Sequence, residues 1–482
     1  MNWQDQLAEF WPYVVAGLGV LTSMFAAIHA VLNKRDSRAA ALWLGFICLL
    51  PFVGPLLYLA LGINRIRRHA LSLRLGREPD AAASKPIPDD MGEPHQVEAQ
   101  HLRMLAHVVN RVAIRPLIAA NRVQALVNGD EAFPAMLAAI EKATVSVSLA
   151  TYIFDNDRSG NQFVAALARA VARGVQVRVL IDDAGARYSM PSIVGKLRRA
   201  GVPVARFLPT LAPWRLTTIN LHNHRKILVT DGRLGFTGGM NIREGNVLSG
   251  KPRRPVQDLH FKVEGPVVAQ LQDAFVDDWA FCTKEVLAGE RWFPELKECG
   301  AVIARVITDG PEVDLDKLRW TLLGALSCAQ SSVRMLTPYF LPDQALVTSL
   351  NLAVMRGVRV DIILPARNNL PVVHWASRAM WWQVLERGCR IWLTPPPFDH
   401  SKLMIVDNHW VFLGSANWDP RSLRLNFELN VECYGREFAG EMEAIVRTKL
   451  RGAKPVTLEE VDGRPLPVRL RDGVARLFTP YL

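Results

Sequence analysis

Two long apolar runs near the N-terminus dominate the hydropathy pattern of the chain. Residues 12–32 carry no Asp, Glu, Lys or Arg over 21 positions, and residues 39–63 carry none over 25. At 1.5 Å per residue, each run is long enough to cross a hydrocarbon core of about 30 Å. Two buried helices of a soluble protein are the alternative. The pattern favours a transmembrane helical hairpin, with helices at about 12–32 and 39–63 in an anchor formed by residues 1–68.

A polar segment separates these runs from the rest of the chain. Residues 78–96 are rich in Pro, Ala, Asp and Glu and contain almost no large apolar side chain. Such a composition cannot bury enough apolar surface to order a chain. It predicts a linker, assigned to residues 69–120.

The remaining sequence repeats its own pattern of apolar strands and Gly turns. The strand-like run Val145–Phe154 is echoed by Ser332–Phe340, and Arg173–Asp182 is echoed by Arg356–Pro365. The second pair opens with Arg-Gly and continues with β-branched residues, which is typical of a loop that enters a buried strand. Landmarks of the two copies are offset by about 176 to 187 positions.

A repeat of this length indicates duplicated domains, because solenoid repeats are much shorter. Strands that alternate with helical stretches predict the α/β class. We therefore expect two α/β domains, residues 121–300 and 301–482, each with a mostly β-sheet core flanked by helices.

The net charge and the cysteine spacing limit the classes of ligand that the chain is expected to bind. Lys and Arg outnumber Asp and Glu by 57 to 46, giving a net charge of +11. This favours an anionic partner, either nucleic acid or an anionic lipid surface. The six cysteines show no C-x-x-C pair, so no zinc site is indicated. Five arginines follow the second apolar run (Arg65, Arg67, Arg68, Arg74 and Arg77) and three basic residues lie between the runs, so the body is predicted to be cytoplasmic.

The motif H-x-K-x4-D occurs once in each copy of the repeat. The two copies are His224, Lys226 and Asp231, and His400, Lys402 and Asp407. In both, a glycine follows the aspartate by seven positions, and an asparagine, Asn241 or Asn417, follows that glycine by three. One bare copy is weak evidence for a site. Two copies with the same downstream spacing inside a repeat are strong evidence.

The spacing of the motif suits phosphoryl chemistry. His and Lys at positions i and i+2 of a strand point to one face, and the Asp-Gly or Asp-Asn pair then turns the chain into a hairpin. An ammonium and an amide can bind phosphate oxygens, while an imidazole attacks phosphorus or transfers a proton. A carboxylate is expected behind each ring, and Asp258 and Glu428 are the candidates.

In this order of residues the chain resembles the phospholipase D superfamily, and within it the bacterial cardiolipin synthases. The stretches that carry the resemblance are KRDSRAAALWL, LPFVGPLLYLALG, GGMN, GSANWDPRSLRLNFELN and RLFTPYL. The resemblance implies two phospholipase D-like domains with the active site at their interface. It implies transfer of a phosphatidyl group from one phosphatidylglycerol to another, with release of glycerol and a phosphohistidine intermediate.

The resemblance also implies a role for each motif residue. His224 would be the nucleophile and His400 the acid–base, although the pseudo-symmetry allows the reverse order. Lys226, Lys402, Asn241 and Asn417 would bind the phosphate, and Asp258 and Glu428 would orient the imidazoles. Asp231 and Asp407 would brace the motif. Gly239 and Ser415 occupy equivalent positions near the phosphate, so the two halves are not chemically equal.

No metal or cofactor is implied, and the expected location is the bacterial inner membrane with a multi-pass anchor. The expected partner is the anionic phospholipid itself rather than nucleic acid, and the sequence leaves the oligomeric state open. A hydrolase that uses water as acceptor is the main alternative, and a nuclease of the same superfamily is a second. The C-terminal stretch 468–482 alternates basic and apolar residues, which suits surface packing or membrane contact equally.

Overall fold

The computed structural model describes residues 3–34, 37–62, 96–209, 221–310 and 316–479. The end of the predicted anchor and the predicted linker up to residue 95 lie outside the described residues. The chain divides into an N-terminal anchor unit and a body that contains both halves of the repeat.

The anchor unit is one long helix followed by shorter helical pieces. These are α1 (Trp3–Asn33), α2 (Ser37–Leu49), α3 (Val53–Leu57) and the π-helical turn η1 (Tyr58–Gly62). The first predicted span lies within α1. The prediction of one continuous helix over 39–63 is wrong, because the chain turns between α2 and α3. Pro51 lies at this break; proline lacks an N–H to continue the helix and disfavours helical backbone in the residue before it.

The pieces of the anchor unit pack on a small apolar core of their own. It consists of Ala26 and Ala30 of α1, Ile47 of α2 and Tyr58 of η1. The Tyr58 hydroxyl lies 2.8 Å from Nδ1 of His29. Among the described helices, only α1, over Phe10–Asn33, is long and apolar enough to cross a membrane. With 13 residues, α2 is about 20 Å long and is shorter than a hydrocarbon core.

The body is built around one mixed sheet in which fifteen strands are described. The first half contributes β1 (Ile118–Val127), β2 (Ser146–Thr151), β3 (Gln176–Asp182), β4 (Val204–Phe207), β5 (Ile227–Thr230), β6 (Leu234–Gly238) and β8 (Leu259–Glu264). The second half contributes β9 (Val302–Asp309), β10 (Ser332–Leu336), β11 (Arg359–Pro365), β12 (Arg390–Thr394), β14 (Leu403–Val406), β15 (Trp410–Gly414), β16 (Glu428–Tyr434) and β17 (Lys454–Val456).

The strand order confirms the duplication. The first half runs β4-β3-β2-β5-β6-β8-β1 and the second runs β12-β11-β10-β14-β15-β16-β9, with β17 beyond β12. In each, the repeated strand-like runs form a parallel pair, β2 with β3 and β10 with β11. The halves join through antiparallel pairing of β1 with β9. A separate parallel pair, β7 (Val256–Gln257) with β13 (Phe398–Asp399), also connects the halves.

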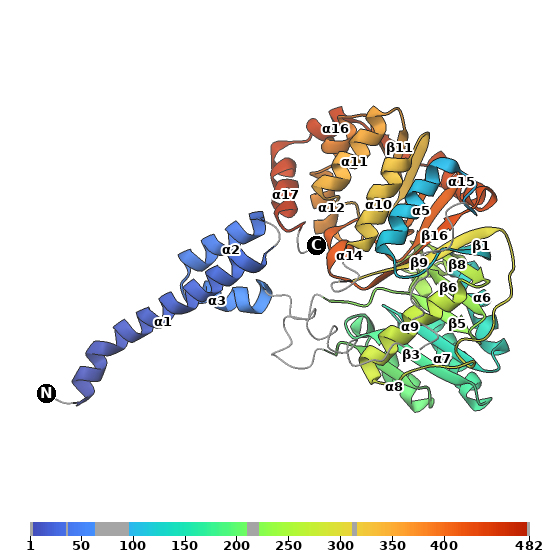
Figure 1. Ribbon diagram of the computed structural model, residues 1–482, viewed down its shortest axis with the longest axis horizontal. Coiled ribbons are helices and arrows are strands. Elements are labelled where there is room, and N and C mark those ends of the chain that lie inside the picture. The colour runs from blue at the N-terminus through green and yellow to red at the C-terminus, as the bar shows by residue number, and fades with distance from the viewer. Residues whose placement is uncertain (1–2, 35–36, 63–95, 210–220, 311–315, 480–482) are drawn as a thin grey trace. The chain divides into compact units, whose positions relative to one another are not determined.

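Helices cover both faces of the sheet (Figure 1). Those of the first half are α6 (Asn128–Lys142), α7 (Arg158–Ala172), η3 (Gly185–Arg187), α8 (Ile193–Arg199), η5 (Glu244–Asn246), η6 (Leu248–Gly250) and α9 (Val268–Thr283). Those of the second are α10 (Lys317–Cys328), α11 (Gln344–Met355), α12 (Pro371–Arg378), α13 (Trp382–Leu385), α14 (Pro420–Arg424), α15 (Arg436–Arg451), α16 (Leu458–Asp462) and α17 (Leu466–Leu477). Helices α9 and α15 share one apolar core that draws on strands of both halves.

Part of the predicted linker is an ordered element of the body. Helix α5 (Gln100–Val112) buries Leu102, Leu105, Ala106 and Val109 in the apolar core of the second half. These residues recur at spacings of three and four, which place them on one face of a helix. The ordered body thus begins before residue 121.

Candidate active site

The end of each H-x-K-x4-D motif forms a β-hairpin, as predicted, but the His and Lys come directly before the first strand and not within it. The hairpins are β5–β6 and β14–β15, which pair in antiparallel register. Their turns have consecutive positive φ values, 52° and 64° at Asp231 and Gly232 and 51° and 53° at Asp407 and Asn408. Two left-handed residues in succession match the strand twist and suit Asp, Asn and Gly. The motif thus fixes a tight hairpin in both halves.

The motif aspartates brace the far ends of these hairpins. The Asp231 carboxylate accepts hydrogen bonds from the backbone amides of residues 144–146, at 2.8 to 3.1 Å. The Asp407 carboxylate accepts from the amides of residues 330–332, each at 2.8 Å. It also contacts Nε2 of His101 in α5 at 2.8 Å. Each aspartate therefore ties its hairpin turn to the start of β2 or β10.

The two halves exchange backbone contacts at the histidines. The His224 amide donates to the Phe427 carbonyl at 2.9 Å, and the His400 amide donates to the Gln257 carbonyl at 2.8 Å. In each case the accepting residue directly precedes a candidate carboxylate, Glu428 or Asp258. Each histidine is thus brought against the carboxylate of the opposite half, although each carboxylate follows its own half's histidine in sequence.

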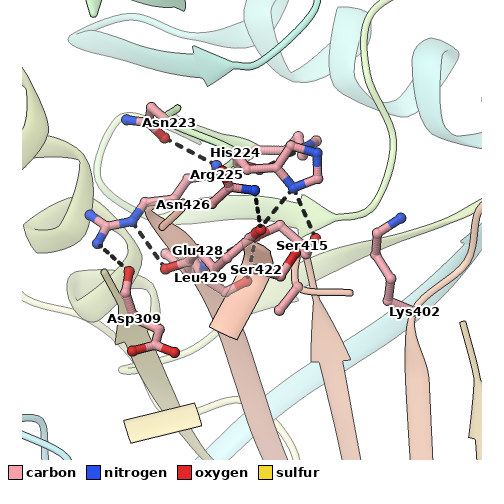
Figure 2. Close-up of polar contacts among 12 residues, drawn as sticks. Asn223, His224, Arg225, Asp309, Lys402, Ser415, Ser422, Asn426, Glu428 and Leu429 are labelled. Carbon is pink, nitrogen blue, oxygen red and sulfur yellow. Dashed lines mark hydrogen bonds and ion pairs between the residues drawn. The ribbon is translucent and has the colours of Figure 1, made fainter. Parts of the chain in front are cut away.

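The His224 ring lies between a carboxylate and a backbone carbonyl (Figure 2). Its Nδ1 is 3.1 Å from Oε2 of Glu428 and 3.1 Å from the Ser415 carbonyl oxygen. Both neighbours accept hydrogen bonds, so Nδ1 carries the proton and Nε2 keeps its lone pair. The Ser415 hydroxyl donates to Oε2 of Glu428 at 2.5 Å, and the side-chain amide of Asn426 donates to Oε1 of Glu428 at 3.2 Å.

The His400 ring has a simpler partner. Its Nδ1 is 2.8 Å from Oδ2 of Asp258, and Oδ1 of Asp258 accepts from the Leu259 amide at 2.8 Å. Gly239 occupies the position that matches Ser415. A Cβ placed on Gly239 would lie 2.5 Å from Oδ1 of Asp258. Glycine is therefore needed here, because the carboxylate packs directly on its backbone.

Burial and neighbouring charges shift the pKa values of the His224–Glu428 pair and of the His400–Asp258 pair differently. Burial lowers the pKa of His224 below its usual range, although Glu428 acts in the opposite sense. Burial also acts to raise the pKa of Glu428, but His224, Lys226 and Ser415 outweigh it and the pKa lies below its usual range. Burial, with the charges of Lys402 and Lys226, holds the pKa of His400 well below its usual range. Burial raises the pKa of Asp258 to about 7.

The two lysines are buried next to the histidines. Nζ of Lys226 donates to the His224 carbonyl at 2.6 Å, and Nζ of Lys402 donates to the His400 carbonyl at 2.5 Å. Burial lowers the pKa of Lys226 to about 7 and that of Lys402 to about 8. An ammonium that loses its proton so readily is one that lacks sufficient negative charge around it. An anionic group between the lysines would restore their positive charge.

The motif asparagines, Asn241 and Asn417, are both buried. Oδ1 of Asn241 accepts from the Ile153 amide at 3.0 Å, which leaves its NH2 group to donate elsewhere. Oδ1 of Asn417 is buried and has no hydrogen-bond partner among the described residues.

Sequence reasoning missed three side chains around the histidines. The Tyr152 ring lies 5.1 Å from the His224 ring, and the Tyr339 ring lies 6.2 Å from the His400 ring, measured between centroids. Both follow the first strand of their repeat, in the runs TYIF and TPYF, but one position apart, since Tyr152 matches Pro338 and Tyr339 matches Ile153. Arg225 donates from Nε to the Glu428 carbonyl at 3.1 Å and pairs through Nη1 with Asp278 at 2.8 Å. It ties the first motif to the strand that carries Glu428.

Comparisons with known proteins agree with this architecture. A family model described as cardiolipin synthase, PLD-like domain, matches residues 136–279 and 322–449. A model described as phospholipase D-nuclease N-terminal matches residues 21–62. The structure is similar to phosphatidylserine synthase of Haemophilus influenzae, with a TM-score of 0.63 at 15% identity, covering 78% of this chain and 100% of that one. That likeness concerns the fold alone.

Curated relatives match almost the full length. Cardiolipin synthase of Geobacillus sp. (strain WCH70) is 31% identical over 480 residues, which cover 98% of this chain and 96% of that protein. Cardiolipin synthase A of Pseudomonas syringae pv. syringae is 32% identical over 481 residues, covering 98% of each. The chain therefore belongs to the cardiolipin synthase family of phospholipase D-like proteins.

Proposed function

We propose that this chain is a phosphatidyltransferase that makes cardiolipin and glycerol from two molecules of phosphatidylglycerol. The observation that carries the proposal is that each histidine contacts a carboxylate of the opposite half. Each is held at Nδ1 by a carboxylate of the opposite half, at 3.1 Å for His224 and 2.8 Å for His400. Both Nε2 atoms are then left to act on one phosphodiester, in a site between the halves. The names of full-length relatives supply the substrate class.

The two half-reactions use the histidines in turn. Nε2 of His224 attacks phosphorus, and the bond from phosphorus to the glycerol oxygen breaks. Glycerol leaves with a proton from His400, which leaves a phosphatidyl group on His224. His400 then takes a proton from a hydroxyl of the second phosphatidylglycerol, whose oxygen attacks phosphorus and releases His224. The atoms and electrons of these two steps balance without an oxidant, a reductant or a further reactant.

The pKa of both imidazoles is lowered, so the order rests on the opposite pKa shifts of the two carboxylates. The pKa of Glu428 is low and that of His224 is lowered, so at neutral pH an anion faces a neutral imidazole, which is the form a nucleophile needs. The pKa of Asp258 is raised to about 7, so the His400–Asp258 pair retains a proton near neutrality. A general acid needs that proton.

The remaining motif residues divide into phosphate ligands and supports. Lys226, Lys402, Asn241 and Asn417 would bind the phosphate oxygens, and a bound phosphate would raise the low lysine pKa values. Ser415 and Gly239 were expected next to the phosphate. Their contacts favour a positioning role instead, through Glu428 and Asp258.

For the architecture, we propose phospholipase D-like domains within residues 121–300 and 301–482, with β1 beginning at Ile118 and α5 packed on the second domain, joined to a membrane anchor. Both apolar runs would enter the bacterial inner membrane as a hairpin, with the second run interrupted at Pro51. The basic residues after the second run favour a cytoplasmic body.

The test is to supply the purified full-length protein with phosphatidylglycerol as its sole lipid and to measure the products. Cardiolipin and free glycerol in equal amounts are expected. Phosphatidic acid without cardiolipin would instead establish the hydrolase, which shares the same intermediate and uses water as acceptor. The His224→Asn protein is the control for contaminating activity.

A further inference from the structure

The C-terminal helix α17 carries an apolar face that no described part of the body covers. The exposed fractions of its large apolar side chains are 66% for Leu466, 60% for Leu470, 54% for Val474, 72% for Leu477 and 54% for the adjoining Phe478. At about 100° per residue, these five positions fall within an arc of about 120°. Such a stripe normally faces a protein core, and here it faces outward.

Positive charge flanks this stripe on both sides. Arg469 and Arg476 are exposed on one side and Arg471 on the other, as the helical spacing places them. The helix has a single carboxylate, Asp472, which is buried. Asp472 accepts from Arg464 at 2.6 Å and from Arg471 at 2.7 Å. The exposed surface of α17 therefore combines apolar and cationic groups without an exposed anion.

The buried face of α17 is linked to the candidate site through one small core. Ala475 of α17 packs with Val373 of α12 and with Tyr339, and Phe398 packs against the same cluster. The rings of Tyr339 and Phe398 lie 6.2 Å and 5.9 Å from the His400 ring, measured between centroids. One layer of side chains, which includes Tyr339 and Phe398, thus lies between the helix and the His400 ring.

We propose that α17 is an interfacial membrane helix, which docks on an anionic phospholipid surface and holds the His400 side of the site against the lipid. Leu466, Leu470, Val474, Leu477 and Phe478 would enter the boundary between headgroups and acyl chains, and the arginines would bind headgroup phosphates. A second copy of the helix fits less well, because cationic flanks would face cationic flanks. The apolar helix α1 on the same chain keeps a bilayer within reach. The link to lipid delivery rests on the proposed function, whereas the docking does not.

Substitution on the stripe separates docking from catalysis. Leu470→Glu adds a charge at an exposed position and leaves the core untouched. It should lower activity on phosphatidylglycerol in bilayers roughly tenfold, the cost of excluding about one leucine from the interface. Activity on a short-chain phosphatidylglycerol dissolved as monomers should be unchanged. Met104→Glu is the matched control, since Met104 is 66% exposed on α5 and should tolerate the charge in both assays. Equal losses in both assays, or no loss in bilayers, would refute the proposal.

A second measurement does not depend on turnover. A nitroxide is attached at position 470 of the full-length protein, reconstituted in vesicles that contain phosphatidylglycerol, with position 104 as the control. Position 470 should be accessible to oxygen and shielded from a water-soluble nickel chelate, whereas position 104 should be open to the chelate. Chelate access at 470 overturns the proposal even if the enzyme makes cardiolipin. Dipolar coupling between two labels at 470, with chelate access retained, would assign the stripe to a contact between copies of the chain.

Discussion

The two halves of the body place the same motif on equivalent hairpins but hold their carboxylates unequally. Glu428 receives hydrogen bonds from His224, Ser415 and Asn426, whereas Asp258 receives them from His400 and the Leu259 amide. Additional donors stabilise the ionised form of a buried carboxylate. Burial acts to raise the pKa of both carboxylates, but at Glu428 the charges of His224 and Lys226 and the bonds from His224 and Ser415 lower it, whereas burial raises the pKa of Asp258 to about 7. One backbone frame thus supports two different proton affinities, which is how a duplicated site can divide a nucleophile from an acid.

Removal of either histidine should have the largest effect on activity. His224→Asn and His400→Asn should each lower kcat roughly 10⁴-fold or more, as losses of paired catalytic groups do. They should differ with a phosphatidyl ester of p-nitrophenol, whose leaving group needs no proton. His400→Asn should release one equivalent of p-nitrophenolate in a burst and stall, and His224→Asn should release none. The opposite pattern would exchange the two roles.

Removal of each carboxylate's charge should have the next largest effect. Glu428→Gln should lower kcat roughly 10³-fold or more, because His224 loses the anion that orients its ring. Asp258→Asn should cost less, roughly 10²-fold, because a group whose pKa is about 7 is already partly protonated at neutral pH. Turnover measured side by side at neutral pH checks the ranking. A larger loss of kcat in Asp258→Asn than in Glu428→Gln would mean that Asp258 contributes more to catalysis than Glu428.

The Ser415 and Gly239 positions allow a finer test. Ser415→Ala removes one donor from Glu428, so kcat/KM should fall roughly tenfold. The pKa of Glu428 should rise, and the acidic limb of the pH profile should move to higher pH. Gly239→Ala places a Cβ 2.5 Å from Oδ1 of Asp258 and should disturb the basic limb instead. If Ser415 were a direct phosphate ligand, its loss would change KM and leave both limbs in place.

The pH dependence of the unaltered protein should show the smallest but most direct effect. His224 has a lowered pKa and must be neutral to attack, so kcat/KM should reach its plateau below the ordinary histidine value of 6.5. Asp258 titrates near 7, Lys226 near 7 and Lys402 near 8, and each loses its proton as the pH rises. Activity should therefore fall severalfold above about pH 7 to 8. Lys402→Arg keeps its charge at high pH, and an unchanged basic limb in that variant would exclude Lys402 as its cause.

The elements that the sequence predicted correctly rest on short-range chemistry. The Asp-Gly and Asp-Asn turns favour positive φ, and the short apolar runs before them favour buried strands, so both motif hairpins could be predicted from a few neighbouring positions. The same holds for the strand-like runs that form β2, β3, β10 and β11, although their parallel pairing was not predicted. The prediction of one continuous helix over the second apolar run was wrong, because hydropathy shows the length of an apolar run but not the helix break at Pro51. The residues of α5 also follow a short-range helical pattern, which the neighbouring polar segment obscured.

By itself the sequence determined the duplicated motif, the hairpins that carry it and the family to which the chain belongs, because these depend on residue type and local spacing. Only the tertiary structure decided that Glu428 faces His224 and Asp258 faces His400. The backbone contacts that set this exchange join residues about 140 to 200 positions apart, at Gln257–His400 and His224–Phe427. Local spacing cannot distinguish them from pairing within one half. The fold also decided that Ser415 bonds Glu428, since that bond exists only where β15 and β16 pair.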